Sequence, residues 1–509
     1  MTQVVNEPEE IAAASPAPDP APPTDDLARN TVRGASWSAA GQAARQVVQF
    51  GISIVTARLL LPHDFGLVAQ IVIINALANL ITDIGLGAAI VQRKDLEERH
   101  TSSVFWVHVG LGTLVMATVM ATAPLVASFY GEHELTNVLL VVALSYIPSS
   151  MCTVQRALLT RDMRFRATSM IDLVALAGSG GVCVVLAVAG AGVMSIAFQV
   201  VALNVITVVL LWAVGGWRPK RRFSRDAVRD LLPYSRNLFA FSIVNRLVRN
   251  GDNVIIGRSL GATDLGLYAR GYSILLYPTR QITSVLGNVM FSSLSKLSDD
   301  PERLKRGYLR AIAIISLVTF PLMAGIAVVA HHFVPALLGN HWLPAVTIIR
   351  VFAIVGLGES VFTTVGWLYQ ATGRTDLLFR VGLALGLLPL AAIVIGVNIG
   401  TLDAVVAGYA IASLALLYPV IRIAGSLIDM TFTDVMCSLA PVSLCTAVMV
   451  AATLGVDAVL PSGMSHLAAL AVDGAAGGAI YVALVHLLHI APYLDARDQV
   501  LVHLRRRSA

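Results

Sequence analysis

Long apolar runs follow one another along most of the chain, from about residue 36 to residue 490, and short polar or Pro- and Gly-containing segments separate them. Many runs reach 18 residues or more, the length that a helix needs to cross the roughly 30 Å hydrocarbon core of a bilayer. Helices satisfy their backbone polar groups internally, so they are the form that such runs take in lipid. The pattern therefore predicts an all-α polytopic membrane protein.

We expect about 14 transmembrane helices when apolar windows are read between charged residues and Pro or Gly breaks. The first six cover residues 36–58, 66–90, 104–129, 135–155, 168–189 and 193–214. The next six cover residues 233–258, 265–292, 309–333, 343–369, 377–398 and 403–427. The last two cover residues 434–456 and 466–490.

The basic residues outside these helices orient the chain. Of 36 Lys and Arg residues, 27 lie in the tails, in the connections on one side of the membrane or in the helix ends beside them, whereas the opposite connections contain none. Basic connections stay in the cytoplasm, so both termini are expected there. A basic loop can also bind nucleic acid, but orientation explains the pattern without a nucleic-acid partner.

One corner between two helices occurs twice in the sequence. VTARLLLPHDFGLVA begins at Val55 and IIGRSLGATDLGLYA begins at Ile255, 200 residues later, with six of 15 positions identical. Six expected helices separate the copies, an even number, so both copies cross the membrane in the same direction. We therefore expect two pseudo-symmetric six-helix lobes, residues 33–230 and 231–430, related as a parallel repeat, and two further helices within 431–492.

The composition and the tails agree with this class. Hydrophobic residues make up 56% of the 509 positions and charged residues 13%, against about 25% charged residues in a soluble domain. Residues 1–32 are acidic and rich in Pro and Ala, which predicts a disordered cytoplasmic tail, and residues 493–509 form a basic cytoplasmic tail. The four cysteines lie in or beside apolar helices, without the spacing of a disulfide framework or a metal site.

The helix that opens each lobe carries polar residues on one face. The two sets are Gln42, Arg45, Gln46 and Gln49 in the first helix and Ser242, Asn245, Arg246 and Arg249 in the seventh. The spacing i, i+3, i+4, i+7 places each set on one helix face. A polar stripe within a membrane faces the bundle interior or water, so we expect both stripes to line one central cavity between the lobes.

Subtracting the 27 peripheral Lys and Arg residues from 36 leaves nine deeper in the expected helices, and all nine are arginine: Arg45, Arg58, Arg236, Arg246, Arg249, Arg258, Arg270, Arg280 and Arg350. Acidic residues at comparable depth are fewer: Asp83, Asp172, Asp252, Glu359 and Asp473. Intramembrane ionisable groups are costly and mark functional sites. Because arginine binds phosphate oxygens with its planar fork and keeps its charge when desolvated, the positive surplus predicts an anionic cargo.

We rank the candidates for the cargo cavity by their place in the repeat. Arg45, Arg246 and Arg249 come first, together with the stripe residues Gln42, Gln46, Gln49 and Asn245, and Arg58, Arg258, Arg270, Arg280 and Arg350 follow. Asp83, Asp252 and Glu359 pair with these arginines or take part in ion coupling. The alternatives are that single arginines only bridge helices, and that Arg58 and Arg258 extend to the membrane interface.

The sequence carries no sign of a pump or an enzyme. None of the four lysines follows a glycine, so the G-K-[ST] loop of an ATPase is missing. His331 and His332 lie at a helix end without metal-ligand spacing, and we interpret them as interfacial residues. No catalytic constellation, metal site or cofactor is expected.

The chain resembles the polysaccharide-biosynthesis flippases of bacteria, members of the multidrug/oligosaccharidyl-lipid/polysaccharide exporter superfamily. The segments that carry the resemblance are ARLLLPHDFGL, DIGLGAAIVQ and NVIIGRSLGATDLGLYARGYSILLYP, within residues 33–430. The plan of this superfamily, two six-helix lobes and in some members two further helices, agrees with the helices counted above.

The resemblance implies a function. Such proteins move an undecaprenyl-pyrophosphate-linked oligosaccharide repeat unit from the inner to the outer leaflet of the bacterial cytoplasmic membrane, by alternating access between the lobes. The implied product is lipopolysaccharide, capsule or exopolysaccharide, and the implied partners are the lipid-linked substrate, membrane lipids and a polysaccharide polymerase. A pyrophosphate fits the arginine-rich interior.

Three alternatives remain open. A lipid II flippase of peptidoglycan synthesis has the same architecture and an anionic head group. A cation-coupled multidrug exporter favours acidic residues in its cavity, opposite to this sequence. A membrane-embedded glycosyltransferase or polymerase needs catalytic residues in a large extracytoplasmic loop, and none of the loops on that side exceeds about a dozen residues.

The predicted topology is tested by reporter fusions. A reporter fused after Gly131 should lie outside the cytoplasm and one fused after Lys220 inside it, because an odd number of expected helices separates the two positions. A pair of compartment-specific reporters, one active on each side, checks this. Finding both fusion points in the same compartment would contradict the helix count.

Overall fold

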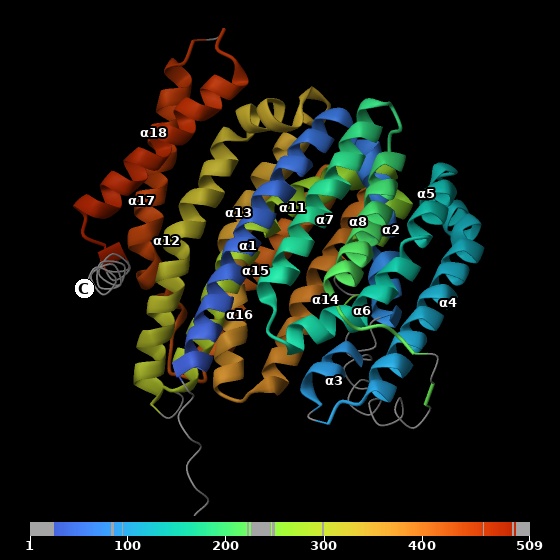
Figure 1. The fold of residues 1–509 in the computed structure, drawn as a ribbon. Helices are drawn as coiled ribbons and strands as arrows, with labels where there is room; N and C mark the ends of the chain where they lie inside the picture. Colours follow the sequence, from blue (N-terminus) through green and yellow to red (C-terminus); the bar gives the residue numbers. More distant parts are fainter. Residues whose placement is uncertain are drawn as a thin grey trace, which may run out of the picture.

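The computed structural model describes residues 25–82, 86–93, 95–220, 223–224, 246, 250–297, 300–461, 463–490 and 493–494, with side chains from residue 41 onward except at 275–286, 288–289 and 291–293. Throughout this part of the chain every regular element is a helix (Figure 1). The all-α fold class is therefore confirmed.

The first half of the chain forms α1 (Asp25–Leu59), α2 (Pro62–Thr82), α3 (Leu86–Gln92), α4 (Glu98–Tyr130), α5 (Glu134–Ala143), α6 (Tyr146–Arg161), α7 (Phe165–Val188) and α8 (Met194–Val214). The second half forms α11 (Ala262–Ser295), α12 (Pro301–Phe333), α13 (Ala345–Ala371), α14 (Thr375–Ile399), α15 (Leu402–Ala415) and α16 (Leu417–Gly425). A π-helical turn, η1 (Val334–Leu338), and a short 3₁₀ turn, η2 (Asn340–Trp342), join α12 to α13. The chain closes with α17 (Phe432–Val459) and α18 (His466–Leu487).

Eleven spans among the described helices are long and apolar enough to cross a membrane. The broken helices α5–α6 and α15–α16 each count as one of these spans. The helices α1 and α11 have 35 and 34 residues but are too polar to be counted, and the expected seventh helix lies largely outside the described residues. The total of 14 helices stays a prediction.

Several helix boundaries differ from the prediction, and two of these differences lie near the N-terminus. The first helix begins at Asp25, so the prediction of a disordered tail over residues 1–32 is wrong for residues 25–32, and residues 1–24 lie outside the described part. The prolines of the tail end at Pro23, and two acidic residues, which favour a helix N-terminus, follow directly. The predicted helix 66–90 is divided, because α2 ends at Thr82 and α3 begins at Leu86.

Local capping explains several helix ends. Pro62, which cannot continue α1, is the first residue of α2, where a missing N–H costs nothing. The Asp64 carboxylate accepts a hydrogen bond from the Leu61 N–H at 2.9 Å, so this residue caps the helix from its first turn. Gly131 ends α4 in the left-handed conformation, with φ of 75°, which glycine adopts at little cost.

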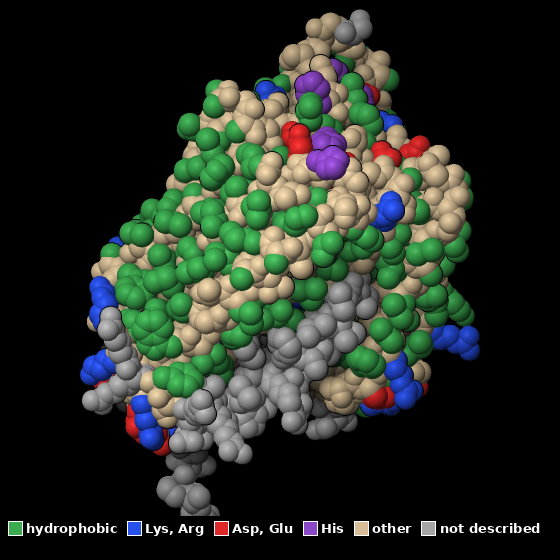
Figure 2. All heavy atoms as spheres, turned by 90° about the vertical axis from the view of Figure 1, so that its right-hand side faces the viewer, with side chains coloured by type: hydrophobic (Ala, Val, Ile, Leu, Met, Phe, Trp, Pro, Cys, Tyr) green, Lys and Arg blue, Asp and Glu red, His purple; other side chains and the backbone are tan. Residues whose placement is uncertain are grey.

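We name the two ends of the bundle by their connections. The corner end holds the joins α1–α2, α4–α5, α7–α8 and α12–α13, and the basic end holds the joins α6–α7 and α13–α14 (Figure 1). Figure 2 shows apolar side chains over the middle of one face and Lys and Arg side chains mainly along its lower edge, which is the basic end. The apolar middle is the surface expected to contact lipid.

The two halves share their hydrophobic core only at one end, as far as the described side chains show. At the corner end, Ala57 and Ala69 from the first half lie in a core built mainly from α11, α12 and α13. Ala262 of α11 in turn lies in a core built from α2, α4 and α5. Each described core at the basic end draws its side chains from one half alone. The halves are therefore joined at the corner end and separate toward the basic end.

The repeated corner explains the close contact of the halves. Where α2 packs on α11, a methyl group on Gly66 would overlap the Ala262 carbonyl, and one on Gly266 would overlap the Pro62 carbonyl. The two glycines occupy equivalent positions of the repeat, and so do Pro62 and Ala262. Each copy of the corner thus provides the glycine on which the other copy rests.

Adding a methyl group at this contact tests the packing. We expect Gly66→Ala or Gly266→Ala to lower the thermal stability of the detergent-purified protein, because overpacking costs about 1–3 kcal/mol. Gly110→Ala in α4 is the control, since no atom lies within 4 Å of the added methyl group. Equal melting temperatures for all three variants would show that the contact is not tight.

Candidate substrate-binding face between the two halves

The polar stripe of α1 lies beside the contact of α1 with α7. Gly41 faces Ser169 of α7, and Ile52 faces Gly180, whereas Gln42, Arg45 and Gln49 are exposed and Gln46 is half-buried. Val47 and Phe50 are also exposed. By helical position the stripe lies between the α7-facing side and this apolar side. The predicted shared face is therefore present on α1.

Arg45 is only partly neutralised. Its Nη1 lies 3.5 Å from Oδ2 of Asp172 in α7, and the Arg45 side chain is 48% exposed. Arg156 holds the same carboxylate more closely, with contacts of 2.8 and 3.2 Å to its two oxygens. One carboxylate thus serves two guanidinium groups, so a positive charge remains on this face.

The second stripe is described at one position. Arg246 is helical and exposed, while Asn245 and Arg249 lie outside the described residues, as do Asp83 and Arg236. Arg280 lies in α11, but its side chain is not described. Arg350, near the start of α13, is exposed. Within the described part of the chain, the guanidinium groups of Arg246 and Arg350 have no hydrogen bond or ion pair.

Three of the predicted cavity arginines join the two halves at the corner end. Arg270 of α11 donates to the Oγ and the backbone oxygen of Ser53 in α1, at 2.8 and 2.9 Å. Arg58 of α1 donates to the carbonyls of Ala336 and Leu337 in η1, the latter at 3.1 Å. Arg258 lies over the Phe129 ring of α4, 5.6 Å from its centre.

Two further side chains that the sequence analysis did not select take part in this junction. The Trp342 indole N–H donates to the Ala57 carbonyl at 2.8 Å in a buried position. Gln70, the equivalent of Arg270 in the repeat, donates to the Gly257 carbonyl at 3.4 Å. We call the hydrogen bonds of Arg58, Gln70, Arg270 and Trp342 across the halves the corner latch. Gln70 lies 200 residues before Arg270, the interval of the repeat, and this was the sequence signal that could have identified it.

Arg270 also stacks on aromatic rings within the latch. Its guanidinium carbon lies 5.4 Å from the centre of the Phe65 ring and 5.8 Å from that of Trp342, within the range of a cation–π interaction. Phe65 and Trp342 themselves meet edge to face at 5.2 Å. The charge of Arg270 is thus stabilised by ring faces and by Ser53, without a carboxylate among the described residues.

The predicted acidic residues of the second half lie beside a cluster of tyrosines. The Tyr268 hydroxyl donates to Oδ2 of Asp252 at 3.1 Å, and Tyr268 stacks on Tyr272, which meets Tyr409 edge to face. Asp252 and Glu359 both interact electrostatically with Tyr409. We call Asp252, Glu359 and these three tyrosines the tyrosine–carboxylate cluster. The i, i+4 spacing of Tyr268 and Tyr272 was a signal that the sequence analysis did not use.

The predicted site residues thus fall into three places. Arg45 and Arg246 belong to the polar stripes, Arg58 and Arg270 to the corner latch, and Asp252 to the tyrosine–carboxylate cluster. The single cavity-lining set expected from the sequence is divided in this conformation. Whether the latch arginines also contact cargo stays a prediction.

Comparison with known proteins places the chain in a family. Residues 55–347 match the family described as polysaccharide biosynthesis protein. The lipopolysaccharide biosynthesis protein WzxC of Escherichia coli is 28% identical over 377 residues, which cover 73% of this chain and 76% of that protein. The teichuronic acid biosynthesis protein TuaB of Bacillus subtilis is 27% identical over 389 residues, 76% of this chain and 80% of that protein. The succinoglycan biosynthesis transport protein ExoT of Rhizobium meliloti is 24% identical over 328 residues, 64% of this chain and 66% of that protein.

Two solved structures share the fold. The lipid II flippase MurJ in an inward closed conformation superposes with a TM-score of 0.71 at 12% identity, covering 91% of this chain and 99% of that chain. An inward-facing multidrug resistance transporter of the MATE family superposes with a TM-score of 0.57 at 15% identity, covering 76% of this chain and 96% of that chain. This chain is therefore a multi-pass membrane protein with the fold that MurJ and the MATE transporters share, and it belongs to the family of polysaccharide biosynthesis proteins.

Proposed function

We propose that this protein is a flippase that moves an undecaprenyl-pyrophosphate-linked oligosaccharide unit across the bacterial cytoplasmic membrane for polysaccharide biosynthesis. The observation that carries the proposal is the family match over residues 55–347. The relatives named for lipopolysaccharide biosynthesis and for succinoglycan transport support it, and so does the fold shared with a lipid flippase. The protein transports its substrate and does not modify it covalently.

The junction of the halves supports an alternating-access mechanism. The halves join at the corner end through Gly66, Gly266 and the corner latch, and their cores separate toward the basic end. If the basic end is cytoplasmic, as the distribution of Lys and Arg favours, this state receives cargo from the cytoplasmic leaflet. Release on the outside requires the latch bonds to break and the halves to separate at the corner end.

The polar stripes are the proposed first contacts for the pyrophosphate. Arg45 keeps part of its charge because it shares Asp172 with Arg156, and the Arg246 guanidinium is exposed. Both belong to the polar stripes of the helices expected to open the two halves, and in this proposal a diphosphate bound between the halves contacts both guanidinium groups. A bidentate guanidinium–phosphate pair combines charge with fixed geometry.

A lipid II flippase is the second candidate, favoured by the superposition on MurJ. The two functions differ in the glycan that accumulates when transport stops. Mass spectrometry of lipid-linked intermediates in a strain lacking this protein therefore separates them. We expect an oligosaccharide repeat unit on undecaprenyl pyrophosphate; accumulated lipid II would instead support the second candidate.

The tyrosine–carboxylate cluster is the proposed place of ion coupling. Asp252 is held by the Tyr268 hydroxyl at 3.1 Å and by the N–H of Asn253 at 2.9 Å. In the described part of the chain it forms no salt bridge. A carboxylate inside a membrane protein is a group that can bind and release a cation.

Removing one stripe arginine tests the cargo contact. We expect Arg45→Ala or Arg246→Ala to reduce polymer export about tenfold or more, because a hydrogen bond to a charged group contributes roughly 1.5–3 kcal/mol. Export is measured as extracellular polymer at matched protein levels in the membrane. Arg303→Ala is the control, since this side chain is 69% exposed at the basic end and pairs with Asp300. Normal export in both stripe variants would remove these arginines from the cargo path.

Changing the cluster tests the coupling role. We expect Asp252→Asn to make transport in proteoliposomes independent of an imposed proton or sodium gradient, because the amide keeps the size of the side chain but cannot carry its charge. Tyr268→Phe should weaken that dependence, and Asp403→Asn, at an exposed position of α15, should leave it unchanged. Gradient-driven transport that survives in Asp252→Asn would assign coupling to another group.

A further inference from the structure

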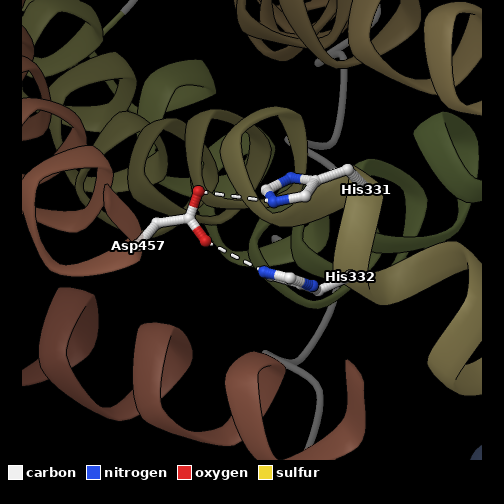
Figure 3. A group of neighbouring side chains, drawn as sticks. All are labelled: His331, His332 and Asp457. Atoms are coloured by element: carbon white, nitrogen blue, oxygen red, sulfur yellow. Dashed lines mark hydrogen bonds and ion pairs between the residues drawn. The ribbon is translucent and has the colours of Figure 1, made fainter. Parts of the chain in front are cut away.

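Two helices far apart in the chain meet through histidines and a carboxylate at the corner end. His331 and His332 form the last turn of α12, and Asp457 lies in the last turn of α17. One oxygen of Asp457 lies 3.3 Å from Nε2 of His331, and the other lies 2.9 Å from Nε2 of His332. Figure 3 shows the two rings converging on the carboxylate from one side. We call these three residues the His–Asp cluster.

The ring of His331 needs a cation between it and Asp457. Its Nδ1 lies 3.2 Å from the Val328 carbonyl, and a carbonyl only accepts hydrogen bonds, so Nδ1 carries the proton. In the neutral ring Nε2 then bears a lone pair, and this lone pair faces a carboxylate oxygen. Two acceptors in this position repel each other unless a proton or a metal ion lies between them.

The Nδ1 atoms of His331 and His332, which point away from Asp457, have contacts like those of metal-binding histidines. A histidine that binds a metal through one nitrogen usually donates its other N–H to a fixed acceptor. His331 has the Val328 carbonyl in this position, and Nδ1 of His332 lies 3.0 Å from Nδ1 of His466, the first residue of α18. Both rings are therefore oriented with Nε2 toward Asp457.

The spacing of the donor atoms suits a tetrahedral ion. The three donor atoms lie within 4.8 Å of one another. Ligands bound to Zn²⁺ at about 2.0–2.2 Å lie roughly 3.3–3.6 Å apart in a tetrahedron, and the Nε2–oxygen distances of 3.3 and 2.9 Å are near this value. A small outward shift of the side chains makes room for the ion. Three protein ligands leave the fourth position to water.

A second carboxylate adds negative charge next to the cluster. Asp473 of α18 is 1% exposed, and within the described part of the chain neither of its carboxylate oxygens has a hydrogen-bond partner. It interacts electrostatically with Asp457 and with both histidines. When ionised, such carboxylates attract a divalent cation, whose charge offsets theirs.

We propose that His331, His332 and Asp457 form a Zn²⁺ site that fastens α17 to the end of α12. Two imidazole nitrogens and one carboxylate form a donor set that suits Zn²⁺, whereas Mg²⁺ and Ca²⁺ favour sites made of oxygen ligands. The site lies on the α12 side of the second half, where α17 and α18 pack (Figure 1). From its two histidines the chain runs directly into η1, whose carbonyls accept the hydrogen bonds of Arg58. The role of the site is thus to hold the two C-terminal helices.

Zinc binding to the purified full-length protein tests the site. The protein, stripped with a chelator in detergent, is titrated with ZnCl₂ at pH 7.5, and bound metal is measured by mass spectrometry after desalting. We expect one Zn²⁺ per chain and a higher melting temperature with Zn²⁺, but not with Mg²⁺. Asp457→Asn and His332→Gln should each weaken Zn²⁺ binding at least tenfold and remove the rise in melting temperature.

Matched controls and a second readout separate this site from other histidines. His341→Gln and Asp403→Asn, both exposed at the corner end, should bind Zn²⁺ like the wild type. Co²⁺ in place of Zn²⁺ should give the visible absorption of a tetrahedral complex in the wild type and lose it in Asp457→Asn. Equal metal content in the wild type and Asp457→Asn, or a cluster that is stabilised by low pH and not by Zn²⁺, would overturn the proposal in favour of a protonated ion pair.

Discussion

The contact of two glycines with two backbone carbonyls is the constraint on which the arrangement of the halves depends. Gly66 and Gly266 let α2 and α11 approach until each helix rests on the first residue of the other. Only at this separation do Arg270 and Gln70 reach backbone groups of the opposite half. A side chain at either glycine would hold the helices apart, and the latch donors would lose their acceptors.

The arginines of the interior perform different tasks because their acceptors differ. At the corner end their partners are backbone oxygens and ring faces, which fix the protein to itself. On α1 the partner is a carboxylate that a second arginine already occupies, so charge is left for a ligand. The C-terminal helices contribute to neither group; they widen the second half on its α12 side and bring a separate set of ionisable groups with them.

Much of the fold follows from the sequence, because apolar runs determine which segments form membrane helices. The expected helices 309–333, 377–398 and 466–490 lie close to α12, α14 and α18. The polar stripe of α1 was also predictable, since helical periodicity alone places Gln42, Arg45 and Gln49 on one face. The start of α1 was predicted wrongly. The expected disordered tail was extended to residue 32, although the Pro-rich segment ends at Pro23 and the helix begins at Asp25.

The partners of the site residues could not be derived from the sequence. Arg58 and Arg270 donate hydrogen bonds to main-chain oxygens. Every residue type carries a main-chain oxygen, so such a partner cannot be recognised from the sequence. Asp457 reaches His332 across 125 positions of sequence only because α17 packs on α12. Such contacts depend on how helices are placed against each other, whereas periodicity reports only what one helix exposes.

The mutual support of the two corners has an evolutionary consequence. The glycine of each copy packs on the backbone of the other copy. A change in the length or the path of the backbone in one copy therefore disturbs the contact that the other copy makes with it. A substitution at either glycine therefore affects the packing of both copies. The mutual contact accounts for the glycine that both copies carry at an interval of 200 residues.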